Sequence, residues 1–156
     1  MCTLSFTGIS QNDSVAKNVV YIDFGGAGVF GSINYSRKFY SIKKFDFDAH
    51  IGISTTKITD FRNKINPQLI LPVGVHIAFG KTHYIELGLG CAYENHVRAN
   101  ANFSPKRYHS FNGNSSLGYK FQKIQGGFLF RAFYSPILER FKTMRHWGGL
   151  SFGYAF

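Results

Sequence analysis

The sequence has 156 residues, among them 17 glycines, 17 phenylalanines and 9 tyrosines, and its formal net charge is +10. This length suits one domain, and the many aromatic residues and glycines favour strands and sharp bends over helices. No apolar run reaches the roughly 18 residues that a transmembrane helix needs. The mean hydropathy of −0.11 does not exclude a membrane β-barrel, because such strands expose only alternate residues to lipid.

The first 17 residues form an N-terminal segment that we expect to lie outside the barrel. Residues 4–10 resemble the tail of a signal peptide, so we predict a mature start near Gln11, and we expect the polar residues 11–17 to be flexible. Cys2 follows Met1 directly, and a lipid anchor at this cysteine is the lesser alternative. Residues 18–156 form the second predicted unit, the barrel itself.

From residue 18 onward, apolar and polar residues alternate as they do in strands with two different faces. In residues 18–39 the alternation is interrupted by Gly25-Gly26-Ala27-Gly28, which can turn because glycine tolerates positive φ. We therefore predict two strands there, with one long bent strand as the alternative. The expected strands, in chain order, are residues 18–25, 28–39, 43–54, 68–80, 83–95, 110–121, 125–136 and 146–156.

The composition of the two strand faces indicates lipid on one side. In residues 83–94, for example, Leu87 and Leu89 alternate with Gly88 and Gly90. The apolar faces carry aromatic residues near many strand ends, and the opposite faces combine Gly, Ala and Ser with single charges of both signs. A soluble sandwich would bury its apolar face against a second sheet. The pattern instead favours a lipid-facing wall around a tight interior.

The number of strands and the lengths of the gaps between them agree with a closed barrel. Bacterial barrels of this kind have an even number of strands, so that the first and last can pair. The gaps around residues 40–42, 81–82 and 122–124 are short, whereas the gaps 55–67, 96–109 and 137–145 are long. Short and long gaps alternate, as periplasmic turns and extracellular loops do. We predict an all-β, closed antiparallel transmembrane β-barrel of eight strands.

Two segments resemble a known group of proteins. Residues 147–156 resemble the C-terminal strand signal of outer-membrane barrel proteins, and residues 20–28 with Ile33-Asn34-Tyr35 resemble the opening of small porin-like barrels. The chain from residue 18 is similar to eight-stranded barrels of the OmpA/OmpX-like superfamily. The resemblance implies a place in the bacterial outer membrane and no enzymatic activity. It also implies recognition of the last strand by the barrel-assembly machinery, through the alternating residues Leu150, Phe152, Tyr154 and Phe156.

Several charged residues fall on the faces expected to point inward. The interior of an eight-stranded barrel is only wide enough for side chains, so these charges must pair with one another. We predict an ion-paired plug, and a narrow gated pore is the alternative. The predicted lumen network consists of Asp23, Asp46, Asp48, His50, His76, Glu86, Lys120 and Arg131.

The three long gaps hold nine cations and two acids, a net charge of +7. Lipopolysaccharide presents phosphates in the outer leaflet, and Arg and Lys pair with phosphates through charge-assisted hydrogen bonds. We therefore expect a basic crown that binds lipopolysaccharide, with a solvated loop surface as the alternative. The crown residues are Lys57, Arg62, Lys64, Arg98, Lys106, Arg107, Arg140, Lys142 and Arg145.

A catalytic site is not expected. Tyr108-His109-Ser110, with Glu94 as a possible partner, is the nearest candidate for lipid A modification. His109 and Ser110 are adjacent, and adjacent strand residues point to opposite faces, so they would converge poorly as base and nucleophile.

Other ligands have weaker support in the sequence. His50, Asp46 and Asp48 share one predicted face, but no motif with metal-ligand spacing includes them, so we expect no metal and no cofactor. Nucleic acid is not an expected partner, because the cations follow no single strand face and no binding motif is present. The expected role is structural, adhesive or accessory in the envelope. The alternative is a subunit of a larger outer-membrane complex, contacted through the aromatic outer wall.

Overall fold

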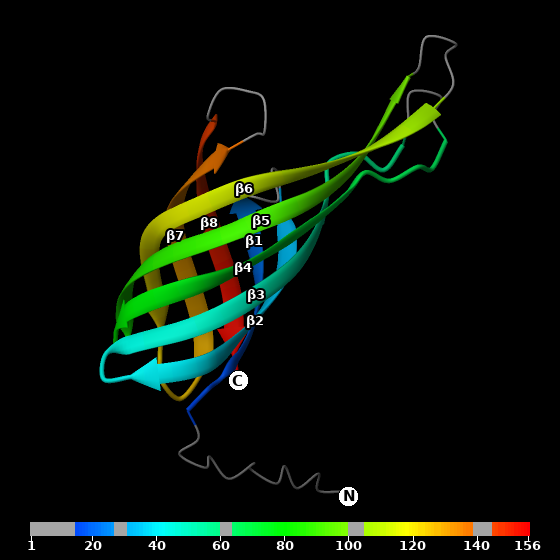
Figure 1. Cartoon of the computed structure of the whole chain (residues 1–156). Coiled ribbons are helices and arrows are strands. Elements are labelled where there is room, and N and C mark those ends of the chain that lie inside the picture. Colours follow the sequence, from blue (N-terminus) through cyan, green and yellow to red (C-terminus); the bar gives the residue numbers. More distant parts are fainter. Residues whose placement is uncertain (1–14, 27–30, 60–63, 100–104, 139–144) are drawn as a thin grey trace, which may run out of the picture.

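The chain folds into a closed barrel of eight antiparallel strands (Figure 1). The computed structural model describes residues 15–26, 31–59, 64–99, 105–138 and 145–156. Each strand pairs with its sequence neighbours, and β1 pairs with β8. The strands are β1 (Asn18–Gly25), β2 (Ser32–Ile42), β3 (Phe45–Thr55), β4 (Leu69–Gly80), β5 (His83–Ala99), β6 (Pro105–Gln122), β7 (Gly127–Leu138) and β8 (Arg145–Ala155).

Closure depends on the pairing of β1 with β8, which runs from Val19↔Ala155 to Gly25↔Gly149. It continues one residue further, because the backbones of Asn18 and Phe156 exchange two hydrogen bonds of 2.9 and 2.8 Å. The sheet therefore has no open edge along the barrel wall at this seam, as membrane barrels require. The predicted fold class and strand number are confirmed.

The segment 18–39 forms two strands, as the glycines near residue 25 predict. Gly25 and Gly26 have φ values of 92° and 74°, so the chain leaves β1 in a backbone conformation that favours glycine. β2 then extends to Ile42, beyond the predicted end at residue 39. A register shift between Lys38 and Tyr40 interrupts its pairing with β3, which resumes on the other side of the bulge.

The hairpin of β5 and β6 is longer than the alternation predicts. We expected a loop over residues 96–109, but the two strands stay paired up to Ala99↔Pro105. β4 pairs with β5 only as far as Asn95, and β7 pairs with β6 only from Gly113, so the end of the hairpin projects beyond the wall (Figure 1). A hairpin without a buried face needs no apolar alternation, and this is why the sequence pattern ended too early.

The barrel has two unlike ends (Figure 1). At one end, short turns at residues 43–44, 81–82 and 123–126 join β2 to β3, β4 to β5 and β6 to β7. The predicted strand starting at residue 125 begins later, because Gly126 and Gly127 have positive φ values and belong to the turn and its exit. The other four connections lie at the opposite end, which we call the long-loop end because it carries the β3–β4 connection of residues 56–68.

The segment before β1 closes part of the short-turn end. The N–H of Ala16 donates to the carbonyl of Ile124 at 3.0 Å, and the carbonyl of Lys17 accepts from the N–H of Lys38 at 2.7 Å. Ala16 is buried with Val19 and Leu129. We expected residues 11–17 to be flexible, but these contacts hold Ala16 and Lys17 in place, and Ala16 fills the apolar end of the lumen. Residues 1–14 lie outside the described part of the chain.

The two faces of the sheet are opposite to those of a soluble protein. Large apolar side chains on the outer face are solvent-exposed in the isolated chain, from Ile22 in β1 to Tyr154 in β8, whereas Asp48, Glu86 and Arg131 are buried inside. This is the arrangement expected when lipid covers the outside. None of the described residues belongs to a helix long and apolar enough to cross a bilayer.

Candidate functional site

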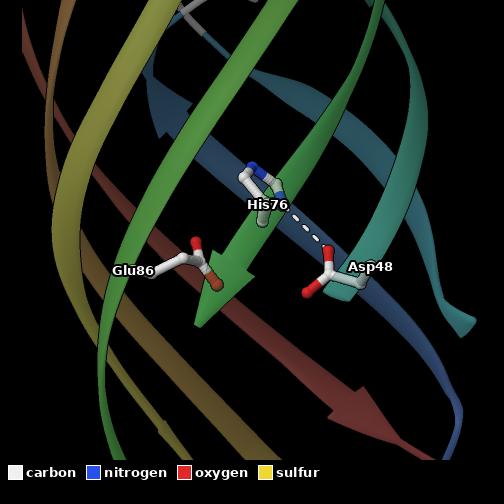
Figure 2. Close-up of side chains that lie close together, drawn as sticks. All are labelled: Asp48, His76 and Glu86. Carbon is white, nitrogen blue, oxygen red and sulfur yellow. Dashed lines mark hydrogen bonds and ion pairs between the residues drawn. The ribbon is translucent and has the colours of Figure 1, made fainter. Parts of the chain in front are cut away.

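The centre of the lumen holds a buried cluster of charged side chains. Asp48 from β3, His76 from β4 and Glu86 from β5 point toward one another across the interior (Figure 2). The Nδ1 of His76 lies 2.9 Å from Oδ1 of Asp48, and the Ser36 hydroxyl donates to the same oxygen at 2.8 Å. Strand alternation places all these side chains inside, because each lies an even number of residues from another inward residue on its strand.

Two cations from β6 and β7 compensate the two carboxylates. Lys120 Nζ lies 3.3 Å from Asp48 Oδ2 and 3.2 Å from Glu86 Oε2, and Arg131 Nη2 lies 2.5 Å from Glu86 Oε1. Arg131 also lies 3.3 Å from Nε2 of His76. A neutral His76 with its proton on Nδ1 satisfies both of its contacts, as donor to Asp48 and acceptor from Arg131. Two positive and two negative groups therefore share one enclosed space.

The three potential ligand atoms of Asp48, His76 and Glu86 lie within 4.8 Å of one another, a separation at which they could share a metal ion. The ion pairs already engage both carboxylates, and Lys120 and Arg131 would repel a divalent cation placed between them. The chemistry of this group fits an ion-pair network better than a metal centre.

The other predicted lumen residues lie above and below this cluster. His50 stacks on His76, with ring centroids 4.3 Å apart. Asp23, toward the long-loop end, accepts a hydrogen bond from Asn34 at 3.0 Å. Asp46, toward the short-turn end, pairs with Lys38 at 2.6 Å. Of the eight predicted lumen residues, five thus form the central group, His50 stacks on that group, and the two remaining acids, Asp23 and Asp46, each have a separate partner.

Lys38 also belongs to the lumen, although it was not among the predicted lumen residues. This residue lies two positions after the inward residue Ser36, so the same alternation extended by one step would have placed it inside. The aromatic rings beside the cations were not predicted either: the guanidinium of Arg131 lies over the rings of Tyr21 and Phe133, at 5.2 and 5.3 Å from their centroids. Phe133 lies two residues after Arg131 on β7, so alternation along that strand would have placed it on the same face. The contact with Tyr21 of β1 depends on which strands face one another across the lumen, and alternation along a single strand carries no such information.

The predicted crown residues divide into three groups. Lys57, Lys64, Lys106 and Arg107 are exposed at the long-loop end. Arg98 pairs with Lys106 in the strand register, and Arg145 begins β8. The remaining three, Arg62, Arg140 and Lys142, lie outside the described residues.

The projecting hairpin and the connection between β3 and β4 touch one another. Arg107 Nη2 donates to Oδ1 of Asn66 at 2.6 Å. In Figure 1 the β3–β4 connection runs beside the projecting part of β5 and β6. This contact brings the cations of two long connections to the same side of the barrel mouth.

The candidate catalytic pair is separated by the sheet. The Nδ1 of His109 lies 2.5 Å from the hydroxyl of Tyr93 on the outer face, and their rings stack. Ser110 lies on the opposite face, where its hydroxyl is 3.5 Å from Glu94. His109 and Ser110 therefore do not meet as base and nucleophile.

The predicted assembly signal lies on the outer wall of β8. Leu150, Phe152, Tyr154 and Phe156 are all exposed there, and Phe152 contacts Phe24, Phe128 and Phe130 in the neighbouring strands. The alternating C-terminal residues therefore form an apolar outer face on β8, which contacts the aromatic residues of β1 and β7.

Comparison with known proteins identifies the fold. No family model matches the sequence, and no curated protein matches it. Among solved structures, the N-terminal β-barrel domain of Pseudomonas aeruginosa OprF matches with a TM-score of 0.57 at 17% identity, covering 90% of this chain and 99% of that one. Ail of Yersinia pestis, the attachment invasion locus protein, crystallised with the heparin analogue sucrose octasulfate, matches with a TM-score of 0.60 at 9% identity, covering 90% and 95%. Neisserial surface protein A matches with a TM-score of 0.50 at 12% identity, covering 90% and 94%. The chain has the fold of the eight-stranded outer-membrane β-barrels.

Proposed function

We propose that this chain spans the bacterial outer membrane as a single barrel with an ion-paired lumen, and that the cations at its long-loop end bind the phosphates of lipopolysaccharide. The role is structural or adhesive, with no catalysis. One observation carries the membrane placement: an apolar band on the outer wall bounded above and below by hydrogen-bonded Tyr–His pairs.

Two of these pairs join the same two strands, β5 and β6. Near the long-loop end Tyr93 of β5 pairs with His109 of β6, and near the short-turn end His83 of β5 pairs with Tyr119 of β6 at 2.6 Å. A third pair, Tyr134 with His146, joins β7 to β8 at the long-loop end. Aromatic residues with a polar tip gather at membrane interfaces, where one end of the side chain is in apolar surroundings and the other is wet.

The spacing of the pairs matches the thickness of a membrane. Tyr93 follows His83 by ten residues, and Tyr119 follows His109 by ten. Ten residues of strand span about 33 Å at a rise of about 3.3 Å each. With a strand tilt of about 40° this becomes a height of about 25 Å, which equals the apolar band of outer-membrane barrels. The outward residues of β5 between the two limits are Ile85, Leu87, Leu89 and Cys91.

Placing a charge in the middle of this band tests the membrane placement. Leu89 is 68% exposed in the isolated chain. In a bilayer, Leu89→Arg should lower the free energy of unfolding by about 2–4 kcal/mol, because the charge lies near the midplane. On a water-facing surface the same change should stay within about 0.5 kcal/mol. The barrel is folded into phospholipid vesicles and unfolded with urea, and the heat-modifiable gel shift measures the folded fraction at each urea concentration.

Ile58→Arg is the matched control. Ile58 is 63% exposed but lies in the β3–β4 connection, beyond the apolar band. We expect this variant to unfold at nearly the same urea concentration as the unchanged chain. Equal stability of the two variants would overturn the membrane placement.

The support for the crown is the group of cations that lies at the long-loop mouth of the barrel. Lys106 and Arg107 are exposed on the projecting hairpin, and Arg98 stands beside Lys106 in its register. A guanidinium has five N–H donors, so the bond from Arg107 to Asn66 leaves further donors for a phosphate. Because the outer leaflet of lipopolysaccharide presents many phosphates, several cations acting together bind it more strongly than one.

The test replaces Arg98, Lys106 and Arg107 with Gln together. We expect the variant to retain less lipopolysaccharide on purification and to bind sucrose octasulfate, a soluble polyanion, more weakly. The control replaces three lysines of the short-turn end, Lys17, Lys43 and Lys123, with Gln, which removes the same charge elsewhere. If the crown variant co-purifies with as much lipopolysaccharide as the control, the proposed crown is wrong.

A further inference from the structure

We infer that the short-turn end of the barrel carries a binding site for an anionic phospholipid, in a pocket between the β2–β3 and β4–β5 turns. This inference rests on the proposed membrane placement, which puts the short-turn end at the phospholipid leaflet. The proposed lipopolysaccharide-binding cations lie at the opposite end of the barrel and are independent of this site.

The short turns are uniformly basic. Each of the three contains lysine, and Lys43, Lys44, Lys81 and Lys123 are all exposed. These turns hold no acid, and within the described residues the one acid at the adjoining strand ends is Asp46, which is already paired with Lys38. The net charge of +10 is therefore distributed over both ends of the barrel.

An open pocket of about 520 Å³ lies at two of these turns. Its lining includes Lys44 and Lys81 at the rim, and Phe79 and Ile85 on the wall. Phe79 and Ile85 are register partners whose side chains face outward, into the apolar band. Cations at the membrane edge beside an apolar wall match the two parts of a phospholipid, a phosphate headgroup and an acyl chain.

A backbone hydrogen bond joins the two turns of the pocket: the N–H of Gly80 donates to the carbonyl of Lys44 at 2.9 Å. A second bond, from the N–H of Gln122 to the carbonyl of Thr82 at 2.9 Å, ties the β4–β5 turn to the end of β6. The pocket therefore has a backbone frame that exists before any ligand binds. Ordering of the site on binding is then limited largely to the lysine side chains.

The pocket also contains a polar pair at headgroup height. His83 and Tyr119 line it, and the Nδ1 of His83 lies 2.6 Å from the Tyr119 hydroxyl. When that nitrogen accepts from the hydroxyl, the neutral ring carries its proton on Nε2, which is a donor for a phosphate oxygen. Lysine binds phosphate as a point charge, so two lysines and one ring donor suit a headgroup with a single phosphate.

Soluble phosphates and proteins fit the site less well. A soluble phosphate would leave the apolar wall of Phe79 and Ile85 unused, and a protein partner would have to lie against a wall that lipid covers. Charge complementarity and the position of the pocket at the membrane edge both favour an anionic lipid.

The test is a lipid titration of the full chain in detergent, read by native mass spectrometry. We expect phosphatidylglycerol to bind more tightly than phosphatidylcholine. Lys44→Gln with Lys81→Gln should weaken the binding of phosphatidylglycerol about tenfold or more, since each lysine near an anionic surface makes a large contribution. Glycerol phosphate at the same concentration should not displace the lipid.

The matched control is Lys17→Gln with Lys123→Gln, which removes two cations of the same end that do not line the pocket. It should change the affinity by about twofold or less. Equal loss in both variants, equal binding of the two lipids, or displacement by glycerol phosphate would overturn the inference. Only barrel that shows the heat-modifiable gel shift, and is therefore folded, is used in the titration. A loss of lipid binding then concerns the lipid site alone, because the membrane placement is tested separately by the Leu89→Arg variant.

Discussion

Arg131 Nη2 lies 2.5 Å from Glu86 Oε1, so that a side chain of β7 reaches one of β5 across the lumen, past the intervening strand β6. Both side chains are buried. A pair of this kind contributes little compared with an apolar pair of the same shape, but it leaves a costly charge when one partner is removed. The lumen is therefore sensitive to the loss of single groups.

Glu86→Gln should lower the free energy of unfolding by about 3–5 kcal/mol, because Arg131 loses its closest carboxylate and Lys120 keeps only Asp48. Urea unfolding in vesicles measures this. Asp46→Asn is the control, since its pair with Lys38 lies closer to solvent at the short-turn end, and it should have a smaller effect. The double variant Glu86→Leu with Arg131→Met should recover part of the loss. A Glu86→Gln barrel as stable as the original would show that the network is not closed to water.

Gly74→Ala should destabilise the barrel by about 1–3 kcal/mol through overpacking. A Cβ at position 74 would lie 2.6 Å from Cε1 of His50 and 2.9 Å from the Cα of Gly90. Gly113→Ala is the control, because a Cβ there would meet nothing within 4 Å. It should be neutral or slightly stabilising. Equal urea midpoints for the two variants would mean that the histidine pair has room to move.

The sequence predicted which face of each strand points inward. Alternation needs only the period of a strand, so it placed Asp48 and Arg131 inside; the count of eight also required the glycines near residue 25 and the even number of strands in bacterial barrels. It did not reveal the length of the β5–β6 hairpin, because strands solvated on both faces carry no apolar pattern.

The contacts inside the lumen could not be read in the same way. Asp48 and Lys120 are 72 residues apart in the chain, and they meet because of the tilt and register of the whole barrel. The sequence also gave no sign that Val19, Leu129 and Ala155 form an apolar cluster at the short-turn end of the lumen. Alternation predicts that each of these side chains points inward, but the register of the strands determines that they lie at the same level along the barrel axis.

The lumen should not conduct ions steadily. The cavities at the central network have volumes of about 30 Å³ toward the long-loop end and about 10 Å³ beside Lys120 and Glu86. Spaces of this size hold about one or two water molecules and no continuous path. In planar bilayers we expect no steady single-channel current from the unchanged chain. Arg107→Ala, on the exposed hairpin, should behave identically.

The alternative of a narrow gated pore predicts a different record. In that case the unchanged chain would conduct steadily, and Arg131→Ala would conduct more, because removing the guanidinium breaks its bonds to Glu86 and His76. These two results together would show that the lumen is a pore and not an ion-paired plug.

Phe156 should matter for assembly in cells and little for stability. Its side chain is 58% exposed on the outer wall, while its backbone forms the two hydrogen bonds with Asn18 that extend the β1–β8 seam. Phe156→Ala keeps those bonds, so the yield of refolding into vesicles should be nearly unchanged. If the last strand is the signal for the barrel-assembly machinery, the same variant should give several-fold less folded barrel in the outer-membrane fraction, measured by the heat-modifiable gel shift. Phe39→Ala removes an equally exposed aromatic ring, 63% exposed, from β2 and controls for the loss of lipid contact. Equal amounts of the two variants in cells would contradict a role of Phe156 in recognition, and a loss of refolding in vesicles specific to Phe156→Ala would assign the side chain to closure of the barrel instead.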